Sequence, residues 1–491
     1  SLSMPLFTVS SSVPRMSDKS SSLPSQSTFS GSSMDISFLY LFLPTVIILY
    51  YAVPQKLKNY LLLLSSLVFY YIGGQKLIWI MLVSITLNYL SALLIEKMRS
   101  TRYAKPILVV SVILNLALLG YYKYFGFFAQ NINSIFGDTI SIPNIVLPIG
   151  ISFFTFQAMS YTVDVYRGTV SAAKNPCTVG AYVTLFPQLI AGPIVRYSEV
   201  EKELKSRTHS LSDFSYGVRR FCIGLGKKVL LANNLAALVK TATYTDEKTV
   251  LLYWMSAVAF TLQIYFDFSG YSDMAIGLCR MFGFHIGENF KYPFISSSIT
   301  EFWRRWHISL GTWFRDYVYI PLGGNRVKKY RWFINITVVW FLTGLWHGAA
   351  WNFVLWGASY GVLLIIEKLF LKKHLDKLPK CVGLVYTLFF TIVGFTIFNA
   401  SSISEAGQIL SAMFGTSGLA LFGEQSLYLL RSYAVTFLIA FIASTPLSAF
   451  LGNKYKDSLA ITIAEPICSA ALLIISTGYL IDGNPFIYFR F

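Results

Sequence analysis

The chain has 491 residues, of which 55% are hydrophobic, 16% are aromatic and only 13% are charged, and its mean hydropathy is +0.56. Because soluble domains carry about 25% charged residues, this composition excludes an ordinary soluble protein and predicts an all-α, polytopic membrane protein. The net charge of +17 comes from basic residues in short clusters between apolar segments, which is typical of cytoplasmic loops and does not indicate nucleic-acid binding.

Residues 1–33 differ from the rest of the chain, since 14 of these 33 residues are serine. Such a segment cannot bury enough apolar surface to fold, so we expect a disordered leader that is not native to the protein. A transit peptide is the alternative, although it would be richer in arginine. An apolar segment opens at Met34, and we expect residues 34–491 to form a single membrane domain.

The apolar segments predict ten to twelve spans in the bilayer, with additional re-entrant and interfacial helices. Basic clusters at 56–58 and 96–105 are expected in the cytoplasm, and the aromatic segment 121–125 at the level of the lipid headgroups. The predicted spans outside the central region are 36–53, 60–72, 77–95, 106–122, 145–166, 251–282, 383–399, 427–448 and 459–481.

Two segments fit this pattern less simply. Residues 184–193 are too short to span and are interrupted by Pro187, Gly192 and Pro193, which predicts a re-entrant or interfacial piece. Residues 214–240 mix basic and apolar residues, so they fit either an amphipathic surface helix or a span with basic ends.

The region around His347 gives the sharpest geometric prediction. Basic clusters at 326–331 and 368–380 both indicate the cytoplasm, and two apolar arms, 332–346 and 351–366, lie between them. A fifteen-residue helical arm is about 22 Å long, whereas the hydrocarbon core is about 30 Å thick. The turn that carries His347 should therefore lie within the depth of the membrane.

An ionisable residue at that depth is a candidate functional residue. His347 can take a proton from a hydroxyl near neutral pH, with Trp346 and Trp351 excluding water from it and Asn352 orienting the substrate or donating a hydrogen bond to an oxyanion. The alternative is a structural histidine bonded to a backbone carbonyl.

His307 is the second candidate. Trp303, Trp306, Leu310 and Trp313 recur at helical spacing around it, which predicts one amphipathic helix in the cytoplasmic interface. The neighbouring arginines would bind the phosphate groups of an acyl donor, unless the segment is only an interfacial anchor. These donor-binding candidates are Arg304 and Arg305.

Further polar residues lie inside apolar segments. Asp267, Tyr271 and Asp273 could support the histidines, or the two carboxylates could be structural partners of backbone donors and arginines. The remaining histidines, His209, His285 and His374, are expected in solvated loops. Five cysteines without metal-site spacing predict neither a bound metal nor a disulfide framework.

Several longer motifs resemble the membrane-bound O-acyltransferase family, most closely its alginate O-acetylation branch, which is related to the D-alanyl transfer proteins of teichoic acid synthesis. The likeness runs from Met34 to the C-terminus. The motifs that carry it are Phe186-Pro-Gln-Leu-Ile-Ala-Gly-Pro193, Phe266-Asp-Phe-Ser-Gly-Tyr-Ser-Asp273, Asn289-Phe-x-Tyr-Pro-Phe294, Glu301-Phe-Trp-Arg-Arg-Trp-His307, Tyr319-Ile-Pro-Leu-Gly-Gly-Asn-Arg326, Leu345-Trp-His-Gly348, Trp351-Asn-Phe353 and Asn484-Pro-Phe-Ile-Tyr-Phe-Arg-Phe491.

This resemblance implies a funnel through the membrane with an essential histidine, matching His347, at its constriction and a second histidine, matching His307, on the cytoplasmic side. It also implies an activated acyl donor from the cytoplasm, either acetyl-CoA or an acyl-carrier thioester, and no resident cofactor. Delivery would be to an extracytoplasmic acceptor through an acetyltransferase-like or esterase-like partner protein.

The sequence thus predicts an O-acyltransferase in the bacterial plasma membrane that moves acetyl groups toward an exopolysaccharide or cell-wall polymer. Two other classes remain open on the sequence alone. One is a proton-coupled transporter or channel that uses intramembrane aspartates and histidines, and the other is a non-catalytic scaffold of a secretion complex.

Overall fold

The computed structural model describes residues 36–74, 77–190, 192–455 and 458–480, and all regular structure within these ranges is helical. The prediction of an all-α protein is therefore confirmed for the described chain. The serine-rich segment 1–33 and the C-terminal motif 484–491 lie outside the described residues.

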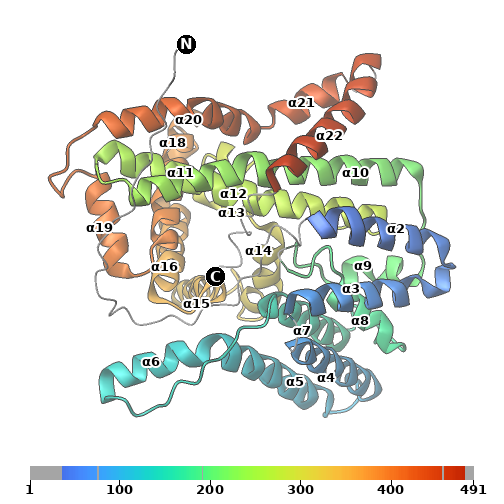
Figure 1. Ribbon diagram of the computed structural model, residues 1–491. Helices are drawn as coiled ribbons and strands as arrows, with labels where there is room; N and C mark the ends of the chain where they lie inside the picture. Colours follow the sequence, from blue (N-terminus) through green and yellow to red (C-terminus); the bar gives the residue numbers. More distant parts are fainter. Residues whose placement is uncertain (1–35, 75–76, 191, 456–457, 481–491) are drawn as a thin grey trace, which may run out of the picture.

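The amino-terminal helices pack around α7 (Ile151–Arg167), which is buried along nearly its whole length and contacts both α4 and α5 (Figure 1). Residues 186–190 form a turn rather than a helix, so no span exists there, as expected. The other elements of this part are η1 (Phe38–Phe42), α2 (Leu43–Ala52), η2 (Gln55–Leu57), α3 (Lys58–Gly74), α4 (Ile78–Lys97), α5 (Ala104–Leu119), η4 (Gly120–Tyr124), α6 (Phe125–Phe136), α8 (Pro176–Thr184) and α9 (Tyr197–Lys205).

Two long helices cross the centre of the molecule side by side (Figure 1). α12 (Val250–Met281) is capped by Thr249, whose side chain accepts a hydrogen bond from the Leu252 amide. Its partner consists of α10 (Leu211–Gly226), η5 (Lys227–Ala232) and α11 (Asn233–Tyr244), which follow one another without a break. Residues 214–240 therefore belong to a helix long enough to cross a membrane, which favours the second of the two possibilities that the sequence left open.

Small residues allow α10 and α12 to lie in backbone contact. A Cβ atom on Gly224 would lie 2.5 Å from the Gly270 carbonyl oxygen, and one on Gly277 would lie 2.5 Å from the Gly217 carbonyl oxygen. Close approach through glycine is a common way for membrane helices to pack. It fixes α12, and with it the residues that α12 presents to the candidate site.

The carboxyl-terminal part contains a hairpin of α15 (Lys329–His347) and α16 (Trp351–Ile366), and α18 (Lys380–Asn399) packs on both α16 and α12. The remaining elements are η6 (Pro293–Ile295), α13 (Ile299–Arg305), α14 (Ile308–Phe314), η7 (Arg315–Tyr319), η8 (Glu367–Leu371), α17 (Lys372–Leu375), α19 (Ile403–Met413), α20 (Glu424–Ala443), α21 (Leu447–Lys454) and α22 (Leu459–Tyr479).

Eight helices within the described residues are long and apolar enough to cross a membrane. The expected number of ten to twelve spans, and the central funnel, stay predictions. The eight helices are Ile78–Lys97, Ala104–Phe136, Leu211–Tyr244, Val250–Met281, Trp351–Leu375, Lys380–Asn399, Glu424–Ala443 and Leu459–Tyr479.

Candidate active site

His347 is the last residue of α15 and lies at the tip of the α15–α16 hairpin. The helix ends there because Gly348 has an extended backbone, with φ −164° and ψ 151°. A Cβ atom on Gly348 would lie 2.2 Å from the Phe353 ring, so only glycine allows the chain to turn so close to that ring. The imidazole is thereby held at a fixed point of the fold.

Aromatic rings enclose His347, which is only 8% exposed. The centroid of its ring lies 5.0 Å from that of Trp346, 5.0 Å from that of Trp356 and 5.3 Å from that of Phe398. No hydrogen bond joins its ring nitrogens to another residue in the part of the chain that the structure describes. They can therefore bond to a substrate hydroxyl.

Trp351, in contrast, does not exclude water from His347. Its side chain is 52% exposed, and its indole nitrogen donates a hydrogen bond of 2.8 Å to Asn131. Trp356, five residues further along α16, occupies the enclosing position that was expected for Trp351. The expectation for Trp351 was wrong because a sequence motif does not fix which side of the helix faces the turn.

His307 lies in the connection between α13 and α14, with φ 46° and ψ 52°. The single interfacial helix expected for this segment is therefore wrong, because a left-handed residue ends one helix and begins the next. The three residues Trp306, Leu310 and Trp313 are buried in the protein core rather than facing an interface. A non-glycine residue in this conformation costs about 1–3 kcal/mol and persists only where its surroundings impose it.

Hydrogen bonds on both sides impose the conformation of His307. The Lys291 amide donates to the Arg305 carbonyl at 2.9 Å, and the Ile308 amide donates to the Asn289 carbonyl at 3.0 Å. At the start of α13 the Glu367 carboxylate of η8 accepts from the Ile299 amide at 2.6 Å. This last contact ties the helix before His307 to the segment that continues α16, and so fixes the two histidines relative to each other.

The His307 ring contacts Phe268 at 4.6 Å, Trp346 at 5.7 Å and His347 at 6.4 Å between centroids. It is 2% exposed, and within the described residues neither ring nitrogen has a hydrogen-bond partner. Burial lowers the pKa of His307 to about 3, so the ring is neutral at physiological pH. A buried polar group without a partner calls for a ligand or a water molecule.

The two arginines before His307 differ in their surroundings. Arg305 forms an ion pair of 2.9 Å with Glu301 and donates to the Lys291 carbonyl. Arg304 is exposed and has no ion pair with any residue that the structure describes. Of the two, Arg304 has the guanidinium that is available to a phosphate.

Asn352 is buried beside the turn, but its amide nitrogen is already engaged. It donates to the Ala400 carbonyl at 2.7 Å and to the Phe398 carbonyl at 3.3 Å, at the end of α18. In this arrangement Asn352 fixes Phe398 against His347 rather than offering a donor to an oxyanion.

The two aspartates of α12 form ion pairs with the neighbouring helix. Asp267 binds Lys228 at 2.5 Å, and Asp273 binds both Arg220 at 2.6 Å and Lys227 at 2.7 Å. These contacts favour the structural alternative for both carboxylates. Tyr271, half-buried on the same helix, lies between them in the sequence.

A sequence profile described as MBOAT, the membrane-bound O-acyltransferase family, matches residues 34–399. The chain belongs to this family. The predicted resemblance is confirmed, and the membrane-bound O-acyltransferase family makes the chain an acyltransferase and, together with its eight apolar helices, a multi-pass membrane protein.

Curated relatives agree with this assignment. A protein named "probable alginate O-acetylase" from Azotobacter vinelandii is 41% identical over 413 residues, which cover 82% of each chain. A peptidoglycan O-acetyltransferase from Helicobacter pylori is 35% identical over 78% of this chain and 80% of the relative. A teichoic acid D-alanyltransferase from Bacillus subtilis is 31% identical over 52% of this chain and 69% of the relative.

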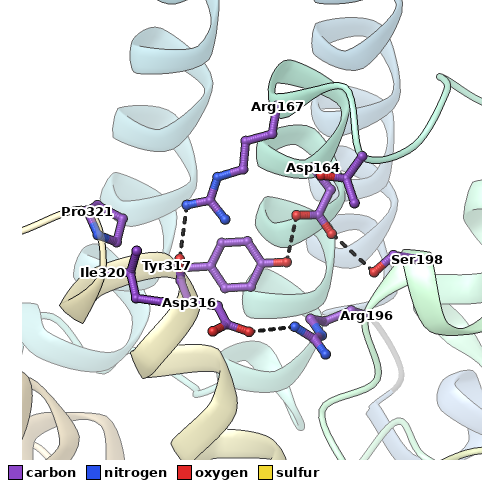
Figure 2. A pocket seen from close by; sticks show the side chains of 9 residues that line it. Asp164, Arg167, Arg196, Ser198, Asp316, Tyr317, Ile320 and Pro321 are labelled. Carbon is purple, nitrogen blue, oxygen red and sulfur yellow. Dashed lines mark hydrogen bonds and ion pairs between the residues drawn. The ribbon is translucent and has the colours of Figure 1, made fainter. Parts of the chain in front are cut away.

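In this acyltransferase a polar cavity of about 460 Å³ opens beside the end of α7 (Figure 2). Arg196 forms an ion pair of 2.6 Å with Asp316, and the Tyr317 hydroxyl donates to Asp164 at 2.8 Å. Burial raises the pKa of Tyr317, so its hydroxyl stays protonated and keeps donating. Arg167, at the end of α7 and three residues after Asp164, donates to the Asp316 carbonyl.

Neither histidine lines this cavity, because a layer of rings separates them from it. Tyr317 contacts Trp313 at 5.2 Å, Trp313 stacks on Phe156 at 3.8 Å, and Phe156 contacts Trp346 at 6.0 Å between centroids. The stack thus connects the cavity wall to the ring that touches both histidines.

Sequence reasoning missed two residues at the site, Lys123 and Tyr124. Both lie in the segment that was expected at headgroup level, yet they bond to the end of α15, at Trp346 and Leu345. The only signal in the sequence was a lysine inside an aromatic run, which is also the pattern of an ordinary interfacial anchor.

Proposed function

We propose that this acyltransferase moves an acetyl group from a cytoplasmic thioester donor toward a hydroxyl of an extracytoplasmic polysaccharide or cell-wall polymer. The observation that carries the proposal is the pair of enclosed imidazoles, His307 and His347, whose rings contact each other and both contact Trp346. Relatives named for O-acetylation of alginate and of peptidoglycan favour acetyl over D-alanyl as the group transferred.

His347 acts as the general base in this proposal. Its neutral ring takes the proton of the attacking hydroxyl, from the acceptor or from a partner protein, while the hydroxyl oxygen bonds to the thioester carbonyl carbon. The tetrahedral intermediate then expels the thiolate, which receives the proton back from the imidazolium. The products are the O-acyl ester and the free thiol.

His307 serves the donor. Its neutral ring can donate one hydrogen bond and accept another, and both nitrogens lack partners in the described chain. We assign it to holding the thioester, with Arg304 binding the phosphate groups of coenzyme A or of a phosphopantetheine carrier. Arg305 would have to release Glu301 to join it.

The same proposal includes the cellular location of the enzyme and a partner protein. The enzyme lies in the bacterial plasma membrane with its basic clusters in the cytoplasm, and no resident cofactor takes part in the step. An extracytoplasmic acetyltransferase-like or esterase-like protein receives the acyl group or passes it to the polymer.

The ion pairs of Asp267 and Asp273 argue against the transporter alternative. A proton path needs carboxylates that can exchange protons, whereas these two are bound to lysine and arginine side chains. We therefore advance no second function.

The test uses the purified full chain in lipid nanodiscs with radiolabelled acetyl-CoA, an acetylated carrier protein and oligosaccharide acceptors. His347→Ala should remain folded and inserted but lose labelled ester formation. His374→Ala is the matched control, because His374 is exposed on α17 and its ring is hydrogen-bonded to the Phe370 carbonyl. Transfer by His347→Ala at the wild-type rate would refute the proposed base.

A further inference from the structure

A π-helical segment inside a long apolar helix directs two neighbouring side chains at the reactive turn. η4 interrupts the helix Ala104–Phe136, and such interruptions are frequent at functional sites. The Lys123 ammonium donates to the Trp346 carbonyl at 2.5 Å, and the Tyr124 hydroxyl donates to the Leu345 carbonyl at 2.9 Å. Segments more than 200 positions apart thus meet just before His347.

These two bonds satisfy two carbonyl groups at the end of α15. The last four carbonyls of a helix have no amide partner within it, and together they carry a partial negative charge. A cation at this end is favourable, and a side-chain donor satisfies a carbonyl that would otherwise be exposed to an apolar environment. Lys123 can supply both the cation and the donor, while Tyr124 supplies only the donor.

The amine of Lys123 has polar and aromatic partners but no acidic one among the described residues. Its other contacts are the Ser152 hydroxyl at 3.3 Å and the face of Trp346, 5.8 Å from the ring centroid, and no carboxylate pairs with it in the described part of the chain. The lysines of η5 differ, since Lys227 binds Asp273 and Lys228 binds Asp267. An ionisable residue in an apolar membrane helix without an acidic partner is a candidate functional residue.

We infer that Lys123 is a positioning residue for the reaction at His347. Its hydrogen bond fixes the end of α15, and its charge stabilises the anionic tetrahedral intermediate. The inference rests on the proposed function. When the acceptor oxygen bonds to the thioester carbonyl, the carbonyl oxygen gains one negative charge. An ammonium held in advance next to the turn lowers the energy of that charge without having to reorganise.

Four variants separate the contribution of the Lys123 charge from that of the hydrogen bonds that cap α15. Initial rates are measured in nanodiscs as a function of donor and acceptor concentration. Lys123→Met should lower kcat by about 100-fold, the size of effect seen when an oxyanion donor is lost, with the KM of either substrate nearly unchanged. Lys123→Arg keeps the charge and should recover most of kcat. Tyr124→Phe removes one cap but no charge and should lower kcat by less than about 10-fold. Lys105→Met, at an exposed position on the same helix, should behave as wild type.

Three results would overturn the inference, and the first two are Lys123→Met with wild-type kcat and folded Lys123→Arg as inactive as Lys123→Met. A lower kcat of Tyr124→Phe than of Lys123→Met would also overturn it, because the cap alone would then explain the effect. If Lys123→Met does not insert, Lys123→Gln, which keeps a donor without the charge, takes its place with the same expectation. His347→Ala is assayed in parallel, since activity there would refute the proposed function, whereas an inactive His347→Ala beside a fully active Lys123→Met refutes only the role of Lys123.

Discussion

The rings of His307 and His347 lie 6.4 Å apart between centroids, although forty positions separate the two residues in the chain. Trp346 contacts both rings. One imidazole is held by a left-handed connection between two short helices, and the other ends a helical hairpin. Two such different local structures give the rings separate orientations, which suits one ring to the donor and the other to the acceptor.

Replacement of His307 by alanine should weaken use of the donor while leaving the acceptor step intact. Losing one hydrogen bond to the thioester should slow acyl loading about 10-fold. Loading is measured as the initial rate of release of free thiol from a labelled thioester. A loading rate equal to that of the wild type would indicate a purely structural role for His307.

Replacement of Arg304 by glutamine should raise the KM for acetyl-CoA by about 10-fold, the cost of one charge-assisted hydrogen bond. The KM for acetyl-pantetheine, which lacks phosphate groups, should not change. Arg305→Gln is the matched comparison and should have a smaller effect, because Arg305 is paired with Glu301. Equal effects of Arg304→Gln on both donors would exclude phosphate binding.

Replacement of Gly348 by alanine should reduce transfer by about 100-fold, because displacing a catalytic group by about 1 Å has an effect of this size. The added methyl group would meet the Phe353 ring and push the His347 turn out of place. Gly407→Ala serves as control, since a Cβ atom there meets nothing within 4 Å. The double variant Gly348→Ala with Phe353→Ala should recover part of the activity, and a fully active single variant would show that the turn tolerates movement.

Replacement of Asp273 by asparagine should act on stability rather than on chemistry. It removes the buried carboxylate that binds Lys227 and Arg220, which costs about 3–5 kcal/mol when one partner of a buried pair is lost. Glu288→Gln, which removes the half-exposed partner of Arg220, should cost about 1 kcal/mol or less. Thermal unfolding in nanodiscs measures both. An Asp273→Asn protein of wild-type stability but without activity would place this carboxylate in the reaction instead.

Features encoded in local sequence could be predicted well. The longest apolar run, 251–282, corresponds to α12 at Val250–Met281, and the basic ends of the two arms around His347 correspond to an α15–α16 hairpin. Apolar length and flanking charge set these helices, and both are visible without knowledge of the fold.

Features set by contacts between distant segments could not be predicted. The tryptophan spacing around His307 fits one helix, but the break there is imposed by backbone bonds from Asn289 and Lys291. Likewise, the commitment of Asn352 to carbonyls at the end of α18 depends on how α16 and α18 meet. The role of Lys123 was hidden for the same reason, since its partners lie on α15 and α7 and only the packing of η4 brings them together.

The rings around His347 also bear on the fate of the activated acyl group. A thioester attacked by water is lost as free acid, and water outnumbers any sugar hydroxyl by orders of magnitude. The rings of Trp346, Trp356 and Phe398 contact the imidazole of His347 and leave little of it exposed to water. In the proposed mechanism, consumption of the donor then depends on arrival of the acceptor, and little of the acyl supply is lost to hydrolysis.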